Sequence, residues 1–186
     1  MNENIINESF RVIDSGGVIL YPSDTIWGIG CDATNEKSIK KVYLIKKRPI
    51  NKQLILLVNN VEMLLNYVEK IDNDIIKTIL KFKKPTTVVY PRPKNLPKIL
   101  TTTNSIAIRV TKDYFCSKLI SKINKPLIST SANISMEKNP NNFKSINKRI
   151  KDMVDYIVNY KTGEELVKAS KIIKINSNNE IEIIRN

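Results

Sequence analysis

The sequence contains no histidine, and this absence excludes several chemistries at once. Serine–histidine–aspartate and cysteine–histidine catalysis, histidine-ligated metals and an imidazole base near neutral pH all require that side chain. The two cysteines, Cys31 and Cys116, are too few and too far apart for a metal site or a CxxC redox motif. Two thiols without an evident partner are typical of a reduced compartment, so we expect a cytoplasmic protein.

Glycine and long apolar runs are also scarce. The five glycines match neither a P-loop nor a dinucleotide-binding fingerprint. No apolar run approaches about 18 residues, the length that a membrane helix needs. The acidic side chains within the first 15 residues differ from a signal or transit peptide. We therefore expect a soluble protein with no membrane segment.

The charge balance is strongly basic, with 31 Lys and Arg against 18 Asp and Glu and a formal net charge of +13. Such a balance favours an anionic partner such as a nucleotide, a nucleic acid or a lipid headgroup. Aromatic residues make up only 6% of the chain, which argues against single-stranded RNA stacked on exposed rings. Binding of double-stranded RNA by shape remains an alternative.

With 186 residues, 41% of them hydrophobic, the chain is long enough for one well-packed domain, which we place at residues 1–186. The expected strands are 18–21, 54–58, 86–90, 105–110, 127–129, 156–158, 172–175 and 181–184. The expected helices are 4–15, 34–48, 60–70, 72–82, 113–123 and 145–152. Strands alternate with helices early and cluster late, which predicts an α/β fold with a mixed sheet.

The first polar cluster is Tyr21–Gly28, at the carboxyl end of an apolar strand. Open α/β sheets bind ligands at such ends. A turn that satisfies its own backbone would have the same composition. Trp27 beside Gly28 and Gly30, which we expect in a loop of small residues, favours close approach by a ligand.

The second cluster contains Lys46, Arg48 and Lys52, after a predicted helix. If this segment is extended, alternation brings the three cations within reach of one point, which suits a polyphosphate. Alternatively, the cations complement the negative end of the helix dipole.

In the third cluster, alternation places Ser129, Ser131 and Asn133 on one side of a strand end. Such a row can hydrogen-bond a ribose, a phosphate or an amino-acid head group, although a serine-rich turn would look alike. Arg109 lies in an otherwise apolar strand, where an unpaired charge is costly, so it must reach solvent or an anion.

Together and in this order, the segments resemble the YrdC family. Residues 17–33 are similar to its opening motif, and Lys46-x-Arg48 with Ser131-x-Asn133 resembles its paired KxR and SxN signature. Further similar blocks cover residues 85–89, 106–109 and 163–170, and the match extends over residues 8–185. The departures are Ser23 for a common Thr, Lys83-Lys84 for Gly-Pro, Met136 for Gly, and Lys171 for a hydroxyl residue.

The resemblance implies a twisted sheet with flanking helices around a basic concave cavity. The family comprises threonylcarbamoyl-AMP synthases, so it also implies an enzyme, a nucleotidyltransferase that uses L-threonine, bicarbonate and ATP. The products are threonylcarbamoyl-adenylate, for the t⁶A modification of tRNA, and pyrophosphate. Because the substrate carbamate supplies the attacking oxygen, positioning and charge neutralisation suffice.

By the same resemblance, three residues bind threonine: Thr25, Arg109 and Ser129. The residues implied to bind ATP are Lys46, Arg48, Lys52, Ser105, Ser131, Asn133, Ser170 and Arg185. Four of these are implied to be catalytic: Lys46, Arg48, Ser131 and Asn133.

No metal ligands are expected in the protein, and Mg²⁺ would be carried by the triphosphate. The implied partners are separate transfer proteins of the TsaD, TsaB and TsaE type, together with tRNA or double-stranded RNA. The alternative is a paralogue of the same fold, non-catalytic or of different specificity, that binds nucleotide or double-stranded RNA.

Overall fold

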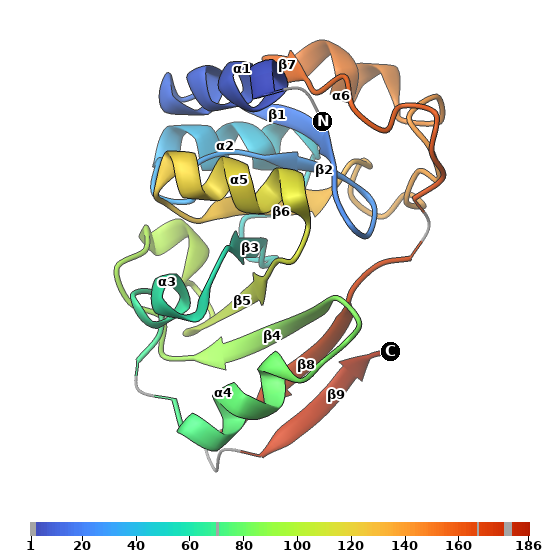
Figure 1. Ribbon diagram of the computed structural model, residues 1–186. Helices are drawn as coiled ribbons and strands as arrows, with labels where there is room; N and C mark the ends of the chain where they lie inside the picture. Colours follow the sequence, from blue (N-terminus) through green and yellow to red (C-terminus); the bar gives the residue numbers. More distant parts are fainter. Residues whose placement is uncertain (1–2, 70, 167, 177–179) are drawn as a thin grey trace.

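In the part of the chain that the structure describes, nine strands form one mixed sheet in the order β7-β1-β2-β6-β3-β5-β4-β8-β9 (Figure 1). The computed structural model describes residues 3–69, 71–166, 168–176 and 180–186. The strands are β1 Ile19–Pro22, β2 Trp27–Gly30, β3 Ile55–Val58, β4 Thr86–Pro91, β5 Ser105–Val110, β6 Leu127–Ser131, β7 Tyr156–Ile157, β8 Lys171–Ile175 and β9 Ile181–Arg185. Three neighbouring pairs, β1–β7, β3–β5 and β4–β8, are parallel and the others antiparallel, which confirms the predicted mixed α/β sheet.

The helices are α1 Glu3–Asp14, α2 Glu36–Ile45, α3 Val61–Leu65, α4 Asn73–Leu80, α5 Tyr114–Ile123 and α6 Lys148–Met153, with a 3₁₀ turn at Lys98–Leu100. Figure 1 shows α1, α2 and α5 stacked beside the β1–β2–β6 part of the sheet, whereas α4 lies at the end that holds β9. Within the described residues, no helix is both long and apolar enough to cross a bilayer.

The core forms because strands with continuous apolar runs are buried on both faces. All four residues of β1 are buried, as are Leu56, Leu57 and Val58 of β3. Helix α5 adds Phe115 and Leu119, both fully buried. Each such side chain contributes roughly 1.5–3 kcal/mol of hydrophobic stabilisation. The packing of the central strands therefore fixes the positions of the polar side chains at their ends.

Strand β2 replaces the loop that the small residues 28–30 predicted. It pairs antiparallel with β1 and β6, and its glycines allow this close approach. A Cβ atom on Gly30 would overlap the carbonyl oxygen of Ile128 and would lie 2.8 Å from the ring of Tyr21. Glycine is thus used for strand packing here, a signal that sequence alone does not distinguish from a loop.

The cation-rich segment after α2 also differs from its prediction. The side chain of Asn35 caps the start of this helix, as expected, and the last helical residue is Ile45. Lys47 then adopts a left-handed backbone with a φ of +49°, and the N–H of Arg48 donates to the carbonyl of Tyr43. Residues 46–52 therefore form turns, and the alternation argument for an extended segment is wrong.

Candidate functional site

A cavity of about 390 Å³ lies on one face of the sheet, within the size range of small-molecule sites. Seven of the residues singled out in the sequence line it: Thr25, Arg48, Arg109, Ser129, Ser131, Ser170 and Arg185. They come from segments far apart in the chain, which the strand order brings together. Its described lining includes three arginines and no acidic side chain, so the cavity suits an anionic ligand.

The side chain of Lys46 lies beneath this lining, and only 1% of the residue is exposed. Its Nζ donates to the carbonyl oxygens of Ser131 and Asn133 and, at 3.1 Å, to Oδ1 of Asn133. Three oxygen acceptors match the three N–H donors of the ammonium group. Lys46 thus joins α2 to the end of β6 and fixes the backbone of the SxN segment.

Ser131 and Asn133 are linked directly as well. The hydroxyl of Ser131 donates to Oδ1 of Asn133 at 2.6 Å, and Nδ2 of Asn133 donates to the carbonyl of Glu137. Ser131 lines the cavity, while Asn133 is buried behind it. Burial, and secondarily the charge of Arg48, lower the pKa of Lys46 to about 7. Lys46 is therefore the titratable member of this buried network.

Arg48 and Lys52 do not converge with Lys46 on one point. The guanidinium of Arg48 lines the cavity, and its Nη2 donates to the carbonyl of Gln53 at 2.8 Å. Lys52 is exposed, and its Nζ lies 3.4 Å from the sulfur of Met136. The turn at Lys47 separates the three side chains, so Arg48 is the cation of this group that faces the cavity.

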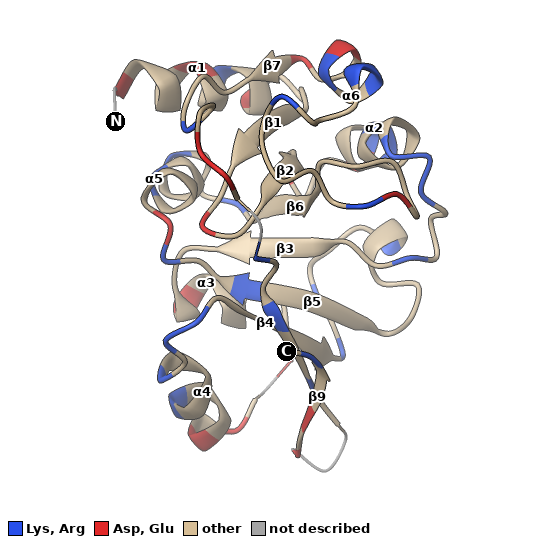
Figure 2. Ribbon diagram, turned by 90° about the vertical axis from the view of Figure 1, so that its right-hand side faces the viewer, with Lys and Arg blue, Asp and Glu red and all other residues tan. Residues whose placement is uncertain are grey.

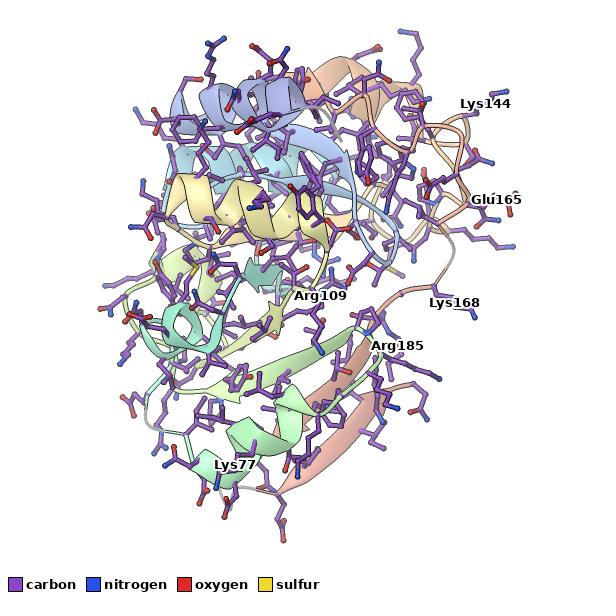
Figure 3. All side chains as sticks on the ribbon, in the orientation of Figure 1. Lys77, Arg109, Lys144, Glu165, Lys168 and Arg185 are labelled. Carbon is purple, nitrogen blue, oxygen red and sulfur yellow. The ribbon has the colours of Figure 1, made fainter. Side chains whose placement is uncertain are left out.

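At the opposite end of the cavity, Arg109 reaches from β5 to the β1–β2 turn (Figure 3). Its Nη1 donates to the hydroxyl of Thr25 at 3.3 Å, and its Nη2 lies 3.3 Å from Oδ1 of Asp24. The hydroxyl of Ser23 bonds that of Thr25 at 2.9 Å. Burial raises the pKa of Asp24, and the positive charge of Arg109 partly offsets this rise. The predicted need of Arg109 for an anion is therefore met in part by a neighbouring carboxylate.

The Nε atom of Arg109 is buried and has no hydrogen-bond partner among the described residues. A buried donor without a partner costs about 1–3 kcal/mol, and more when it belongs to a charged group. An additional acceptor at this position, such as a ligand carboxylate, would remove that cost. Arg109 and Thr25 are thus suited to hold the head group of an amino acid.

The C-terminal strands supply the third side of the cavity. The hydroxyls of Ser170 and Thr87 bond each other at 2.9 Å, and both are buried. Nε and Nη2 of Arg185 donate to the carbonyl of Ser170 at 3.2 and 2.7 Å. Partial burial lowers the pKa of Arg185. The guanidinium group of Arg185 is thus bonded along one edge to Ser170, and the residue also lines the cavity.

Ser105, which the sequence predicts to bind ATP, is connected to the cavity only through another residue. It does not line the cavity, but Nε2 of Gln53, which does, donates to its hydroxyl at 2.6 Å and to its carbonyl at 2.9 Å. Gln53 and Asn139 are lining residues that the sequence analysis missed. A single Gln before a strand and an Asn in a polar loop have no sequence pattern that marks them as binding residues. The position of Gln53 follows from the register of β3 against β5.

The described residues contain no group of three His, Cys, Asp or Glu side chains close enough to hold a metal ion. The hydroxyls in the cavity also have no histidine to act as a base, because the chain contains none. What the arrangement offers is guanidinium groups and hydroxyls held in fixed positions. Such a set can bind, orient and neutralise anionic substrates.

Comparison with known proteins identifies the family of this chain. The Sua5/YciO/YrdC family model, described as telomere recombination, matches residues 11–186. A threonylcarbamoyl-AMP synthase of Pseudoalteromonas translucida is 34% identical over 166 residues, which cover 87% of this chain and 89% of the relative. The Escherichia coli K12 protein of the same name is 34% identical over 143 residues, or 73% of this chain and 75% of the relative.

Solved structures show the same fold. A H234A/Y235A variant of Sua5 from P. abyssi superposes with a TM-score of 0.89 at 24% identity, covering all of this chain and 57% of the Sua5 chain. The present sequence thus spans little more than half of that protein. YciO of E. coli superposes with a TM-score of 0.83 at 20% identity, covering 100% of this chain and 90% of YciO. The chain belongs to the Sua5/YciO/YrdC family.

Proposed function

We propose that this protein is a threonylcarbamoyl-AMP synthase that forms threonylcarbamoyl-adenylate and pyrophosphate from L-threonine, bicarbonate and ATP. The observation that carries the proposal is one cavity in which Arg48, Arg109 and Arg185 surround the hydroxyls of Thr25, Ser129 and Ser131. Relatives bearing that name are 34% identical over most of the chain, and P. abyssi Sua5 has been crystallised with L-threonine.

The proposed reaction needs no protein nucleophile. The amine of threonine and bicarbonate give a carbamate and water. A carbamate oxygen then attacks the α-phosphorus of ATP, and the bond to the leaving pyrophosphate breaks. The protein must hold two anions together and neutralise charge at the reacting phosphate, which guanidinium groups do well.

We assign the ends of the cavity from the contacts of their side chains. Thr25, Arg109 and Ser129 bind threonine, with the unpaired Nε of Arg109 available to its carboxylate. Arg48 and Ser131 face the phosphates, while Lys46 and Asn133 position them from beneath the lining. Lys52, Ser105, Ser170 and Arg185 contact the nucleotide from the rim, either directly or, for Ser105, through Gln53.

The wider setting belongs to the same proposal. Mg²⁺ would be carried by the triphosphate and water, because the described side chains provide no three-ligand site. Residues 1–186 act as one domain in the cytoplasm, and separate transfer proteins of the TsaD, TsaB and TsaE type pass the group to tRNA. A non-catalytic paralogue that binds nucleotide or double-stranded RNA is the competing function, which the basic charge alone would also suit.

The test is product formation from ATP, L-threonine and isotopically labelled bicarbonate, followed by mass spectrometry. We expect a labelled threonylcarbamoyl-adenylate. The Arg48→Ala variant should bind ATP roughly 10- to 100-fold more weakly, because a charge-assisted contact contributes about 1.5–3 kcal/mol. Arg109→Ala and the milder Arg109→Lys should mainly raise the KM for threonine.

Arg92→Ala is the matched control, since Arg92 pairs with Glu69 on the surface and does not line the cavity. It should behave like the wild type. ATP binding without any labelled product would favour the non-catalytic paralogue. Unchanged ATP and threonine binding in both cavity variants would overturn the site assignment.

A further inference from the structure

A second cavity, of about 700 Å³, adjoins the first and shares Ala169 and Arg185 with it. Four cations line this second cavity: Lys84, Lys168, Lys171 and Arg185. We call it the lysine cavity. Lys84 precedes β4 and Lys171 begins β8, so residues that lie far apart in the chain meet at one place.

The register of three neighbouring strands explains this meeting. β4 and β8 run parallel, with Thr86 opposite Lys171, and the N–H of Lys171 donates to the carbonyl of Pro85 at 2.9 Å. β9 runs antiparallel to β8, with Arg185 opposite Ile172. The start of β4, the start of β8 and the end of β9 thus lie side by side. Figure 3 shows Lys168 just before β8 and Arg185 at the end of β9, on the same side of the molecule.

The charges of this cavity are largely unbalanced by the protein. Lys84, Lys168 and Lys171 form no ion pair with any described residue. Two carboxylates belong to the described lining, the side chain of Asp24, which is already paired with Arg109, and the terminal carboxylate of Asn186, so the four cations remain in excess. Figure 2 shows basic residues on many helices and loops, and the four named here line one cavity. Several like charges facing one hollow attract an anion of high charge.

We infer that the lysine cavity is a second anion-binding site and that it takes an oligophosphate of the size of pyrophosphate. Four cations, two of them in strands and two in the loops before β4 and β8, discriminate in favour of a multiply charged ligand over a singly charged one. A double-stranded RNA would instead contact protruding side chains along its backbone. Pyrophosphate as the natural ligand rests on the proposed function, because that reaction would release it in the adjoining first cavity.

The experiment is isothermal titration of the full chain with inorganic pyrophosphate, in the Arg48→Ala background to weaken binding in the first cavity. We expect binding at one remaining site. Adding Lys84→Gln, Lys168→Gln and Lys171→Gln should weaken that binding by about ten-fold or more, because several charge-assisted contacts are lost. Circular dichroism would confirm that each variant is folded.

The matched control carries Lys94→Gln, Lys118→Gln and Lys144→Gln in the same background. These lysines are exposed and line neither cavity, and the net charge changes equally. The control should keep the pyrophosphate affinity of the background. Equal affinities of the two triple variants would overturn the inference and assign the effect to net charge.

Two further ligands distinguish an oligophosphate site from a general anion site and from a nucleic-acid surface. If bicarbonate binds the site as tightly as pyrophosphate, the site is not one for oligophosphate. If the variant lacking Lys84, Lys168 and Lys171 keeps pyrophosphate but loses a short RNA duplex, the lysines serve nucleic acid and the inference fails. These measurements involve no turnover, so failure of the synthase reaction would leave their result intact.

Discussion

Two cations of the candidate site are held in different ways. The ammonium group of Lys46 is buried beneath the lining of the first cavity and bonded to three oxygens of Ser131 and Asn133. Arg185 lies on the exposed edge strand β9, lines the cavity and bonds a single carbonyl, that of Ser170. Lys46 is therefore part of the core, whereas Arg185 is part of the surface.

This difference distinguishes a residue that holds the backbone of the site from a residue that can contact the ligand. A buried cation whose donors are all used by the protein has none left for a ligand, so Lys46 shapes the site through the backbone that it holds. An arginine fixed along one side keeps other N–H groups free to meet an anion. Four predictions test this contrast and the packing around it, beginning with the largest expected effect.

The first prediction applies the same substitution, to methionine, at Lys46 and at Arg185. Lys46→Met should lower the free energy of unfolding by about 3 kcal/mol, because it leaves buried oxygens without donors. Arg185→Met should lower it by about 1 kcal/mol or less, since the strand is exposed and water can replace the bond. Urea unfolding of both variants measures the difference. Equal losses of unfolding free energy would contradict the contrast between the buried Lys46 and the exposed Arg185.

The second prediction concerns the close contact of β2 with β6, which carries Ser131. Gly30→Ala should cost about 2 kcal/mol, because the new methyl group would meet the carbonyl of Ile128 and the ring of Tyr21. Gly163→Ala is the control, with nothing within 4 Å of the new Cβ atom, and should change stability by less than about 0.5 kcal/mol. Similar thermal midpoints for the two variants would argue against the tight packing of β2.

The third prediction follows from the pKa of Lys46, which burial lowers from 10.5 to about 7. Between these values the unfolded chain holds a proton at this site that the folded chain has released. The free energy of unfolding should therefore rise with pH from about 7 to 10.5, by up to about 1.4 kcal/mol per unit relative to Lys46→Met. Parallel stability curves for the two proteins across this window would show that Lys46 keeps an ordinary pKa.

The smallest effect is expected at Met136, on the rim near Lys52. Met136 has a φ of +76°, in the left-handed region, and its side chain is 88% exposed. Met136→Gly should relieve that backbone strain and raise stability by about 0.5–1 kcal/mol. Ser135→Gly, at a position without a positive φ, should instead lower stability slightly. A loss of stability in Met136→Gly would contradict the left-handed strain at this turn.

Much of the fold was predictable from the sequence, because its signals are local. The apolar runs of β1 and β3 and the Asn35 cap each indicated an element or its start, whereas α2 ends at Ile45 and not at the proline after Arg48. β2 was missed because Trp27–Gly30 looks like a loop of small residues until β6 is seen against it. The pairing of strands distant in the chain supplies that information, which no short window contains.

The site was predictable in its members more than in its geometry. Thr25, Arg109, Ser129 and Ser131 lie where strand ends and a charge in an apolar strand indicated. The direction of Lys46 was not predictable, because a left-handed Lys47 turns the chain away from the extended path. Gln53 and the lysine cavity arise from the register of β3, β4, β8 and β9, which composition and spacing do not encode.

The most direct test of the central claim is pyrophosphate release from ATP by the purified protein, with and without L-threonine and bicarbonate. The proposed synthase activity predicts release that requires both co-substrates and that falls sharply in Arg48→Ala while Arg92→Ala retains it. Bound ATP with no release under any of these conditions would contradict it and leave a nucleotide-binding relative of the enzyme.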